Sequence, residues 1–200
     1  IQFSVTTNSV VAELGMVPNQ PLTFATDSKP RWEDALIAYT WDKFFKTGDS
    51  RWPARMAMTK SATAAMTAIQ RLLAEEDVNI KDFFVAGASK RGWTTWTTAA
   101  VDDRVRAIAP IVIDLLNIEP SFEHHWRVYG FWSPAIQDYV DMSTTDWWRS
   151  AESHALFYLV APLSYRDRYT TPKLILNAAG DEFFVPTSSQ FYYDLSLIHI

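Results

Sequence analysis

The chain has 200 residues, with nine tryptophans, eight tyrosines, twelve phenylalanines and a formal net charge of −5. This length suits one sizeable domain with a packed core, and the acidic balance excludes nucleic acid as a partner because phosphate binding needs a basic surface. The absence of cysteine excludes disulfides and a thiolate zinc site, and no apolar run is long enough to span a membrane.

In chain order, residues 9–17 are a largely apolar run that predicts a buried strand, which the prolines at positions 18 and 21 would end. Residues 31–46 predict a helix that Thr47-Gly48-Asp49 would end. Residues 59–76 predict a second helix, since their apolar side chains follow the three-four spacing of one buried stripe, namely Ala62, Ala65, Met66, Ile69, Leu72 and Leu73.

Residues 82–98 predict a strand, a tight turn at Ser89 and a helix. The apolar run Phe83–Ala86 precedes Gly87-Ala88-Ser89-Lys90-Arg91-Gly92, and no further glycine or proline follows until Pro110. Small residues on both sides of a serine let a strand and a helix approach closely in a nucleophile elbow. Ser89 is therefore the candidate nucleophile; the alternative is an ordinary turn, because the usual Gly-x-Ser-x-Gly spacing is one residue longer here.

The second half begins with an expected strand at residues 105–113, which ends next to Asp114. Pro110 lies inside that run, so we expect an edge position, a bulge or a shortened strand. Residues 115–163 predict a mostly helical insertion rich in tryptophan, and residues 173–177 predict another strand followed by a loop with Asp181. The alternation of strands and helices predicts an α/β fold with a doubly wound, mostly parallel sheet.

Both ends of the chain carry expectations of their own. The chain begins at Ile1 without a methionine, and its first residues are typical of the middle of an element, so we expect a fragment of a longer protein. Residues 195–200 resemble a translated sequencing adapter, and residues 196–200 are expected to be a non-native tail. His199 is accordingly not used as a catalytic histidine.

Several stretches together resemble the PhoPQ-activated pathogenicity-related protein family, whose eukaryotic relatives are called autocrine proliferation repressors. The stretches that carry the resemblance are residues 17–22, 33–41, 58–60, 87–93 and 113–117. The resemblance implies an α/β-hydrolase fold, with residues 1–195 as a partial domain and 115–163 as a cap-like insertion. It also implies an extracytoplasmic or secreted setting, and it makes the Ser-Lys-Arg-Gly spacing a family trait.

A serine hydrolase needs a base and an acid, and in α/β-hydrolases these follow the serine in the order acid, then histidine. Asp181 is the candidate acid because it follows an apolar strand within a Gly-Asp turn; its alternative role is that of a turn residue. Asp114 is the rival acid, or else a strand-end or helix-capping aspartate. The base is expected beyond Asp181, in a part of the protein outside the fragment.

The backbone N–H of Lys90 is the candidate oxyanion donor. Lys90 and Arg91 would stand at a helix N-terminus, where cations are disfavoured, so we expect them to pair with Glu or Asp or to hold an acidic substrate. Arg91, Trp93, Trp126 and Trp132 are candidate substrate contacts, although tryptophans more often pack in cores. Glu123-His124-His125 lacks a metal-binding spacing, and we expect neither a metal nor another cofactor.

The sequence thus predicts a serine-dependent hydrolase of esterase or peptidase type, which forms an acyl-enzyme at Ser89 on a small-molecule, peptide or glycan substrate. The alternative is a non-catalytic secreted protein of the same fold that signals or binds through its tryptophan-rich insertion.

Overall fold

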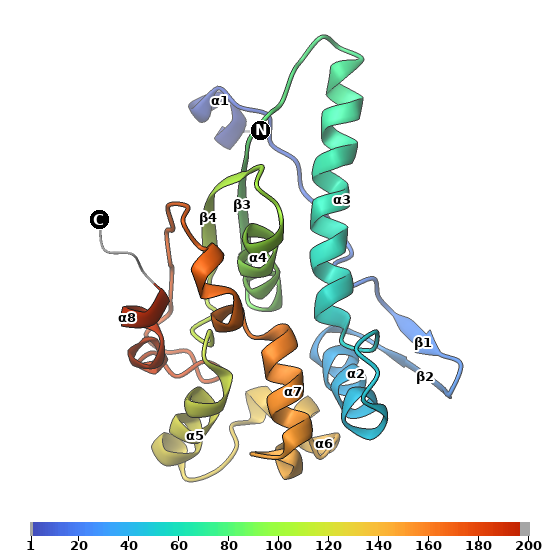
Figure 1. Cartoon of the computed structure of the whole chain (residues 1–200), viewed down its shortest axis with the longest axis vertical. Coiled ribbons are helices and arrows are strands. Elements are labelled where there is room, and N and C mark those ends of the chain that lie inside the picture. The colour runs from blue at the N-terminus through green and yellow to red at the C-terminus, as the bar shows by residue number, and fades with distance from the viewer. Residues whose placement is uncertain (1, 197–200) are drawn as a thin grey trace.

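The structure, a computed structural model, describes residues 2–196 of a mixed α/β protein (Figure 1). In the first half, the elements are α1 (Gln2–Thr7), β1 (Leu22–Phe24), β2 (Asp27–Arg31), α2 (Glu33–Thr47), α3 (Ala54–Ala74), β3 (Phe83–Ala88), α4 (Lys90–Val101) and β4 (Val105–Ile111). The second half contains α5 (Ile118–Tyr129), α6 (Gln137–Asp141), α7 (Ala151–Val160) and α8 (Tyr193–Ser196), with four 3-10 turns at Pro134–Ile136, Thr144–Trp147, Pro162–Arg168 and Ser188–Phe191.

The sheet that positions the site is parallel. β3 pairs with β4 from Phe83 opposite Val105 to Ala88 opposite Ile111. Residues 173–176 lie along the other side of β4 through parallel bridges between Ile108 and Lys173 and between Ile111 and Leu176. The carboxyl ends of all three segments therefore meet at one edge, where the chain leaves toward Ser89, Asp114 and Asp181.

Pro110 lies within β4, opposite Gly87, with bridged chain on both sides. The expectation of a bulge at Pro110 or of a strand shortened to Pro110 onwards is therefore wrong, whereas β4 is an edge strand of a two-stranded sheet whose other side has only isolated bridges. The N–H groups of Ile108 and Val112 donate to Pro172 O and Leu176 O, at 3.1 Å and 2.6 Å, so the missing N–H of Pro110 falls on that same side. Because residues 173–176 make bridges rather than a continuous ladder, the sheet loses only one hydrogen bond there.

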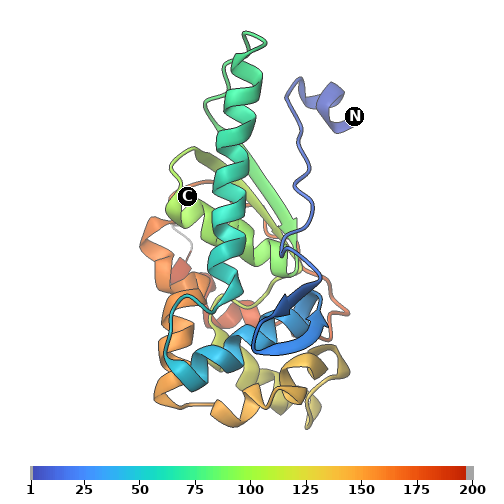
Figure 2. The ribbon, with the colours of Figure 1, turned by 90° about the vertical axis from the view of Figure 1, so that its right-hand side faces the viewer.

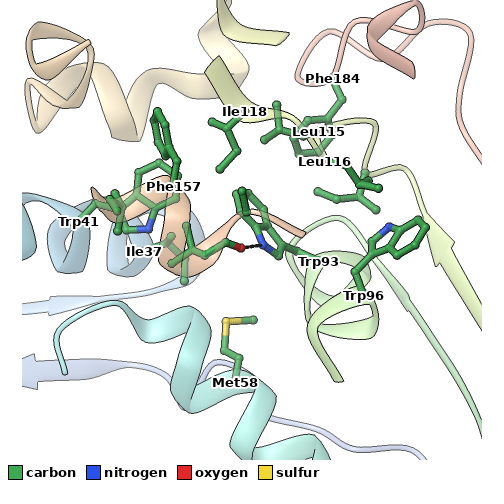
Figure 3. Close-up of a cluster of buried hydrophobic side chains, with 14 of the residues drawn as sticks. Ile37, Trp41, Met58, Trp93, Trp96, Leu115, Leu116, Ile118, Phe157 and Phe184 are labelled. Carbon is green, nitrogen blue, oxygen red and sulfur yellow. Dashed lines mark hydrogen bonds between the residues drawn. The ribbon is translucent and has the colours of Figure 1, made fainter. Parts of the chain in front are cut away.

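Aromatic and aliphatic side chains from α2, α3, α4 and the later helices form the core (Figure 3). The Trp93 indole is 1% exposed, and its Nε1–H donates to Val160 O at 2.6 Å, which fastens α4 to the end of α7. Trp41 on α2 packs edge-on against Trp93 with 6.1 Å between ring centroids. The core thus joins the helix after Ser89 to the helices of the second half.

The predicted helix at 31–46 is confirmed as α2, and the helix predicted at 59–76 is α3, which begins five residues earlier. The predicted buried stripe of α3 is wrong, however, because Met66 is buried but Leu72 is 64% exposed. The C-terminal half of α3 extends away from the rest of the molecule in Figure 2. Three-four spacing indicates an amphipathic face, but it does not show what covers that face.

The buried strand expected at residues 9–17 is also wrong. This segment is extended, unpaired and largely exposed, and it runs beside the sheet to α1 (Figure 2). The described residues form two sheets of two strands each, β1–β2 antiparallel and β3–β4 parallel. The expected doubly wound sheet is accordingly not shown, because its first strand finds no pairing partner within residues 2–196.

Within residues 2–196, no helix is long and apolar enough to cross a membrane. The expected non-native tail at 196–200, with His199, lies outside the described residues except for the backbone of Ser196 at the end of α8.

Two glycines allow the close approach of β3 and α4. A Cβ at Gly92 would lie 2.9 Å from both Gly87 O and Ile113 Cγ2, and a Cβ at Gly87 would lie 2.7 Å from Arg91 O. Real side chains essentially never approach backbone atoms so closely, so both positions require glycine. Gly92, three residues after Ser89, thus allows the same close approach of strand and helix as a glycine two residues after the serine in the usual motif.

Gly92→Ala is expected to lower the free energy of unfolding by about 1–3 kcal/mol, because the new methyl group must displace backbone in a packed region. Denaturant unfolding of the full-length protein measures the change. Gly15→Ala is the matched control, since no atom lies within 4 Å of a Cβ there. Equal unfolding free energies for the two variants would contradict the steric account.

Candidate active site

Ser89 connects the end of β3 to the start of α4 with its backbone in the left-handed region, at φ 53° and ψ −125°. Its N–H donates to Ile111 O at 2.8 Å, and its carbonyl accepts from Trp93 N at 3.0 Å. A non-glycine residue seldom takes this conformation, which costs free energy and persists only where neighbouring contacts enforce it. The serine therefore occupies a strained strand-to-helix turn, as the sequence predicts.

The Ser89 side chain is half-buried, and none of the described residues makes a hydrogen bond to its Oγ. The first residues of a helix have backbone N–H groups without an acceptor inside the helix. Lys90 N–H is such a group, directly after the serine. The turn thus combines a hydroxyl available to a ligand with a nearby N–H donor, as acyl transfer requires.

The two cations that follow Ser89 are paired with the start of α2. Lys90 Nζ lies 2.8 Å from Glu33 Oε2 and 2.8 Å from Asp34 Oδ2. Arg91 donates from both terminal nitrogens to the Glu33 carboxylate, at 2.6 and 2.8 Å, and from Nε to Val17 O at 2.7 Å. Of the two roles that the sequence leaves open, pairing with carboxylates is the one that the described contacts show.

These hydrogen bonds, those from Arg91 above all, lower the pKa of Glu33 from 4.5 to about 2. The carboxylate stays ionised and keeps both cations in place at neutral pH. All three guanidinium nitrogens of Arg91 therefore already donate hydrogen bonds within the described part of the chain.

Asp114 follows β4 and is 1% exposed. Its Oδ2 accepts the N–H of Ser189 at 3.0 Å, and its Oδ1 accepts a short hydrogen bond from the Tyr192 hydroxyl. Burial raises the pKa of the Asp114 carboxyl, while the Tyr192 and Ser189 hydrogen bonds oppose that rise. Both oxygens thus hold the 188–192 segment against the end of β4.

Asp181 lies in the loop after residues 173–176 and is less buried. Its Oδ1 accepts the N–H groups of Phe183 and Phe184, each at 2.9 Å. No described residue donates to its Oδ2. One oxygen therefore fixes the carboxylate in the loop, and the other has no hydrogen-bond donor among the described residues.

The three described histidines are all engaged elsewhere. His125 is buried and accepts the Ser133 N–H at Nε2 at 3.0 Å. His124 contacts Thr187 Oγ1 at 2.7 Å, and His154 lies 3.0 Å from Glu119. None of them makes a hydrogen bond to Ser89, Asp114 or Asp181 within the described part of the chain.

The candidate substrate tryptophans separate into two environments. Trp93 lies in the core and donates to Val160 O, so it joins α4 to the end of α7. Trp126 is 47% exposed at the C-terminal half of α5, and its ring lies 5.0 Å from that of the half-buried Trp132. The structure therefore leaves a surface role open to Trp126 and Trp132, but gives Trp93 a packing role.

The sequence did not predict four residues near the Ser89 turn, which is called the elbow below. They are Glu33, Asp34, Arg55 and Tyr139. The Glu33-Asp34 pair at the start of a predicted helix is what helix electrostatics favour anywhere, so nothing in its spacing marked it as the partner of Lys90 and Arg91. The only sequence feature that pointed to these carboxylates was the presence of Lys90 and Arg91 at a helix N-terminus. Cations are disfavoured there, so they require carboxylate partners from another part of the chain.

The parallel strands, the Ser89 turn and α4 define a class of α/β protein in which a serine lies on a strained turn between a parallel strand and a helix. The chain belongs to the PhoPQ-activated pathogenicity-related protein family, whose sequence profile matches residues 1–197. It is 42% identical over 191 residues to autocrine proliferation repressor protein A of Dictyostelium discoideum, which covers 95% of this chain and 39% of that protein. The chain thus spans about two fifths of its relative's length, and no solved structure matches it.

Replacing Ser89 measures the strain directly. Because glycine adopts left-handed conformations without steric cost, Ser89→Gly is expected to be more stable than Ser89→Ala by about 1–2 kcal/mol. Denaturant unfolding of both variants gives the difference. At the exposed helical residue Ser61 the order should reverse, with Ser61→Gly less stable than Ser61→Ala by about 1 kcal/mol. The same order at both positions would show that Ser89 carries no strain.

Proposed function

We propose that this chain carries the nucleophile and the acid of a serine-dependent hydrolase of esterase or peptidase type. The observation that supports the proposal most strongly is the left-handed Ser89 turn between β3 and α4. Strained non-glycine residues cluster at active sites, where the strain serves to hold a reactive group in place. The proposal includes an α/β-hydrolase fold, with residues 115–163 as a helical cap over the site.

In the proposed reaction, Ser89 Oγ attacks the carbonyl carbon of an ester or amide while a histidine accepts its proton. The Lys90 N–H stabilises the oxyanion of the tetrahedral intermediate, together with a second N–H from another loop. Collapse of the intermediate breaks the bond to the leaving group, which takes the proton from the histidine and leaves an acyl group on Ser89. Water then releases the acid by the same two steps.

Asp181 is the preferred acid over Asp114. Asp181 keeps one carboxylate oxygen without a donor among the described residues, whereas both oxygens of Asp114 are occupied in a buried environment. The acid of a catalytic triad must accept a hydrogen bond from the histidine, so the available oxygen favours Asp181.

The base of the proposed triad is a histidine that follows Asp181 in the full-length protein and is not His199. The chain order serine, acid, histidine of α/β-hydrolases places it after Asp181. The relative is long enough for a segment with such a histidine, since this chain covers 39% of it. The substrate is a small molecule, a peptide or a glycan.

An extracellular location belongs to the same proposal, and its support is the name of the relative, which describes an autocrine repressor of proliferation. That name also favours a second candidate function, a secreted binding or signalling protein without catalysis. The surface that would serve it lies at the end of α5, where Trp126 is 47% and Phe131 54% exposed.

A fluorophosphonate probe applied to the full-length protein tests the hydrolase. We expect covalent labelling that Ser89→Ala abolishes, because only an activated serine reacts with such a probe. Ser61→Ala, at an exposed serine on α3, should label like the natural protein. A folded protein that never labels would favour the binding function instead.

The same probe separates the two acids. In Asp181→Asn the amide oxygen still accepts the two backbone N–H groups, so stability should change little, yet labelling should slow by about two to four orders of magnitude because the histidine loses its acceptor. Asp114→Asn replaces one of the two buried acceptor oxygens by an amide group, which cannot accept a hydrogen bond. We therefore expect the free energy of unfolding to fall by about 1–3 kcal/mol, with labelling retained. The reverse pattern would assign the acid to Asp114.

A further inference from the structure

Resting on the proposed hydrolase function, we propose that Arg55 is a positioning residue, which holds the Ser89 turn in its reactive geometry from the far side of α4. Arg55 lies in the first turn of α3 and is 3% exposed. No hydrogen bond joins it to Ser89 within the described part of the chain. Its effect would pass through Lys90, the residue that carries the oxyanion donor.

The contact to Lys90 is direct. Arg55 donates from Nη1 to Lys90 O at 3.1 Å, and its guanidinium carbon stands 4.0 Å from the centre of the Trp93 ring. A hydrogen bond to the carbonyl and a cation–π contact one turn later together fix the first turn of α4. The N–H of Lys90 is then held at one place relative to Ser89.

The same guanidinium interacts electrostatically with Asp34, one of the two carboxylates that pair with Lys90. It interacts with the Tyr139 hydroxyl, which donates to Asp34 Oδ1 at 3.0 Å. Asp34 in turn lies 2.8 Å from Lys90 Nζ. Arg55 and Asp34 therefore both contact Lys90, at its backbone carbonyl and at its ammonium group, and Tyr139 hydrogen-bonds to Asp34.

Two residues with strained backbone lie next to Asp34 and Lys90 in the chain. Glu33, which binds both Lys90 and Arg91, has φ 46°, and Ser89 has φ 53°. Backbone strain persists only where the surroundings over-determine it. The ion pairs hold the elbow from α2, and Arg55 holds it from α3, so each turn is fixed by residues outside its own element.

A purely structural role explains Arg55 less well. Its Nε has no hydrogen-bond partner among the described residues, and burial lowers the pKa of the guanidinium. Replacing a whole buried ionic cluster by well-packed apolar residues is often neutral or stabilising, so burial of a charge is weak evidence for stability alone. The positioning role, by contrast, explains why this buried charge contacts the residue that follows Ser89.

The test measures inactivation of the full-length protein by a fluorophosphonate, with the maximal rate, kinact, separated from the apparent binding constant, Ki. Arg55→Met keeps the aliphatic stem but removes the donors, and we expect kinact to fall by about tenfold to a hundredfold with Ki unchanged, since small misplacements of reacting groups cost this much. Arg55→Lys restores the charge and one donor and should recover part of kinact.

Arg104→Met is the matched control. Arg104 also joins α3 to its surroundings, through Gln70 and Asp102, and lies 5.8 Å from an aromatic ring, that of Phe83 at the opposite end of β3. It should lower the thermal midpoint without lowering kinact. Equal kinact values in Arg55→Met and Arg104→Met would overturn the positioning role while leaving the hydrolase intact.

Hydrogen exchange at the amides of residues 90–93 in the same variants is a second, independent readout. We expect faster exchange there in Arg55→Met than in Arg104→Met. Equal exchange overturns the positioning role whether or not the natural protein reacts with the probe. A natural protein that does not react at all overturns the hydrolase function, and with it the catalytic meaning of Arg55.

Discussion

The close contact between β3 and α4 is the constraint on which the rest of this structure depends. Glycines at 87 and 92 let the backbone of the strand approach the backbone of the helix, and Ser89 makes the connection with φ 53°. The neighbouring strand completes the arrangement, because Ile111 O accepts the Ser89 N–H at 2.8 Å. The sheet, the turn and the helix are therefore fixed together, and a change in any one of them would displace the serine.

The charges around the turn follow from that constraint. A helix N-terminus disfavours cations, yet α4 begins with Lys90 and Arg91. Glu33 and Asp34 at the start of α2 compensate, and their own position at a helix N-terminus is electrostatically favourable. Two helix starts thus face each other with opposite charges, so that the electrostatic cost at one is offset at the other. Arg55 adds a third cation to this group and reaches the backbone carbonyl of Lys90.

The features that depend on local chain chemistry were predictable from sequence. The strand before Ser89, the tight turn and the helix at 33–47 follow from apolar runs, glycine placement and spacing. Pairing was not predictable in the same way: residues 9–17 have the composition of a buried strand but remain unpaired, and Pro110 is tolerated between two strand segments because its missing donor faces an incomplete ladder. The partners of Lys90 and Arg91, more than fifty positions away in the sequence, depend on how α2 packs on α4, which no local pattern encodes.

The choice of serine at position 89 is the strongest argument for the proposed role of its hydroxyl. Glycine would satisfy the left-handed backbone with less strain, and a protein that only needed a turn between β3 and α4 would gain stability from it. The chain instead keeps a side chain that makes no hydrogen bond to any described residue. Strain retained together with a hydroxyl that has no structural partner is the combination expected where stability is given up for reactivity. Binding through Trp126 and Trp132 would require neither feature, which is why the hydrolase function is the preferred proposal.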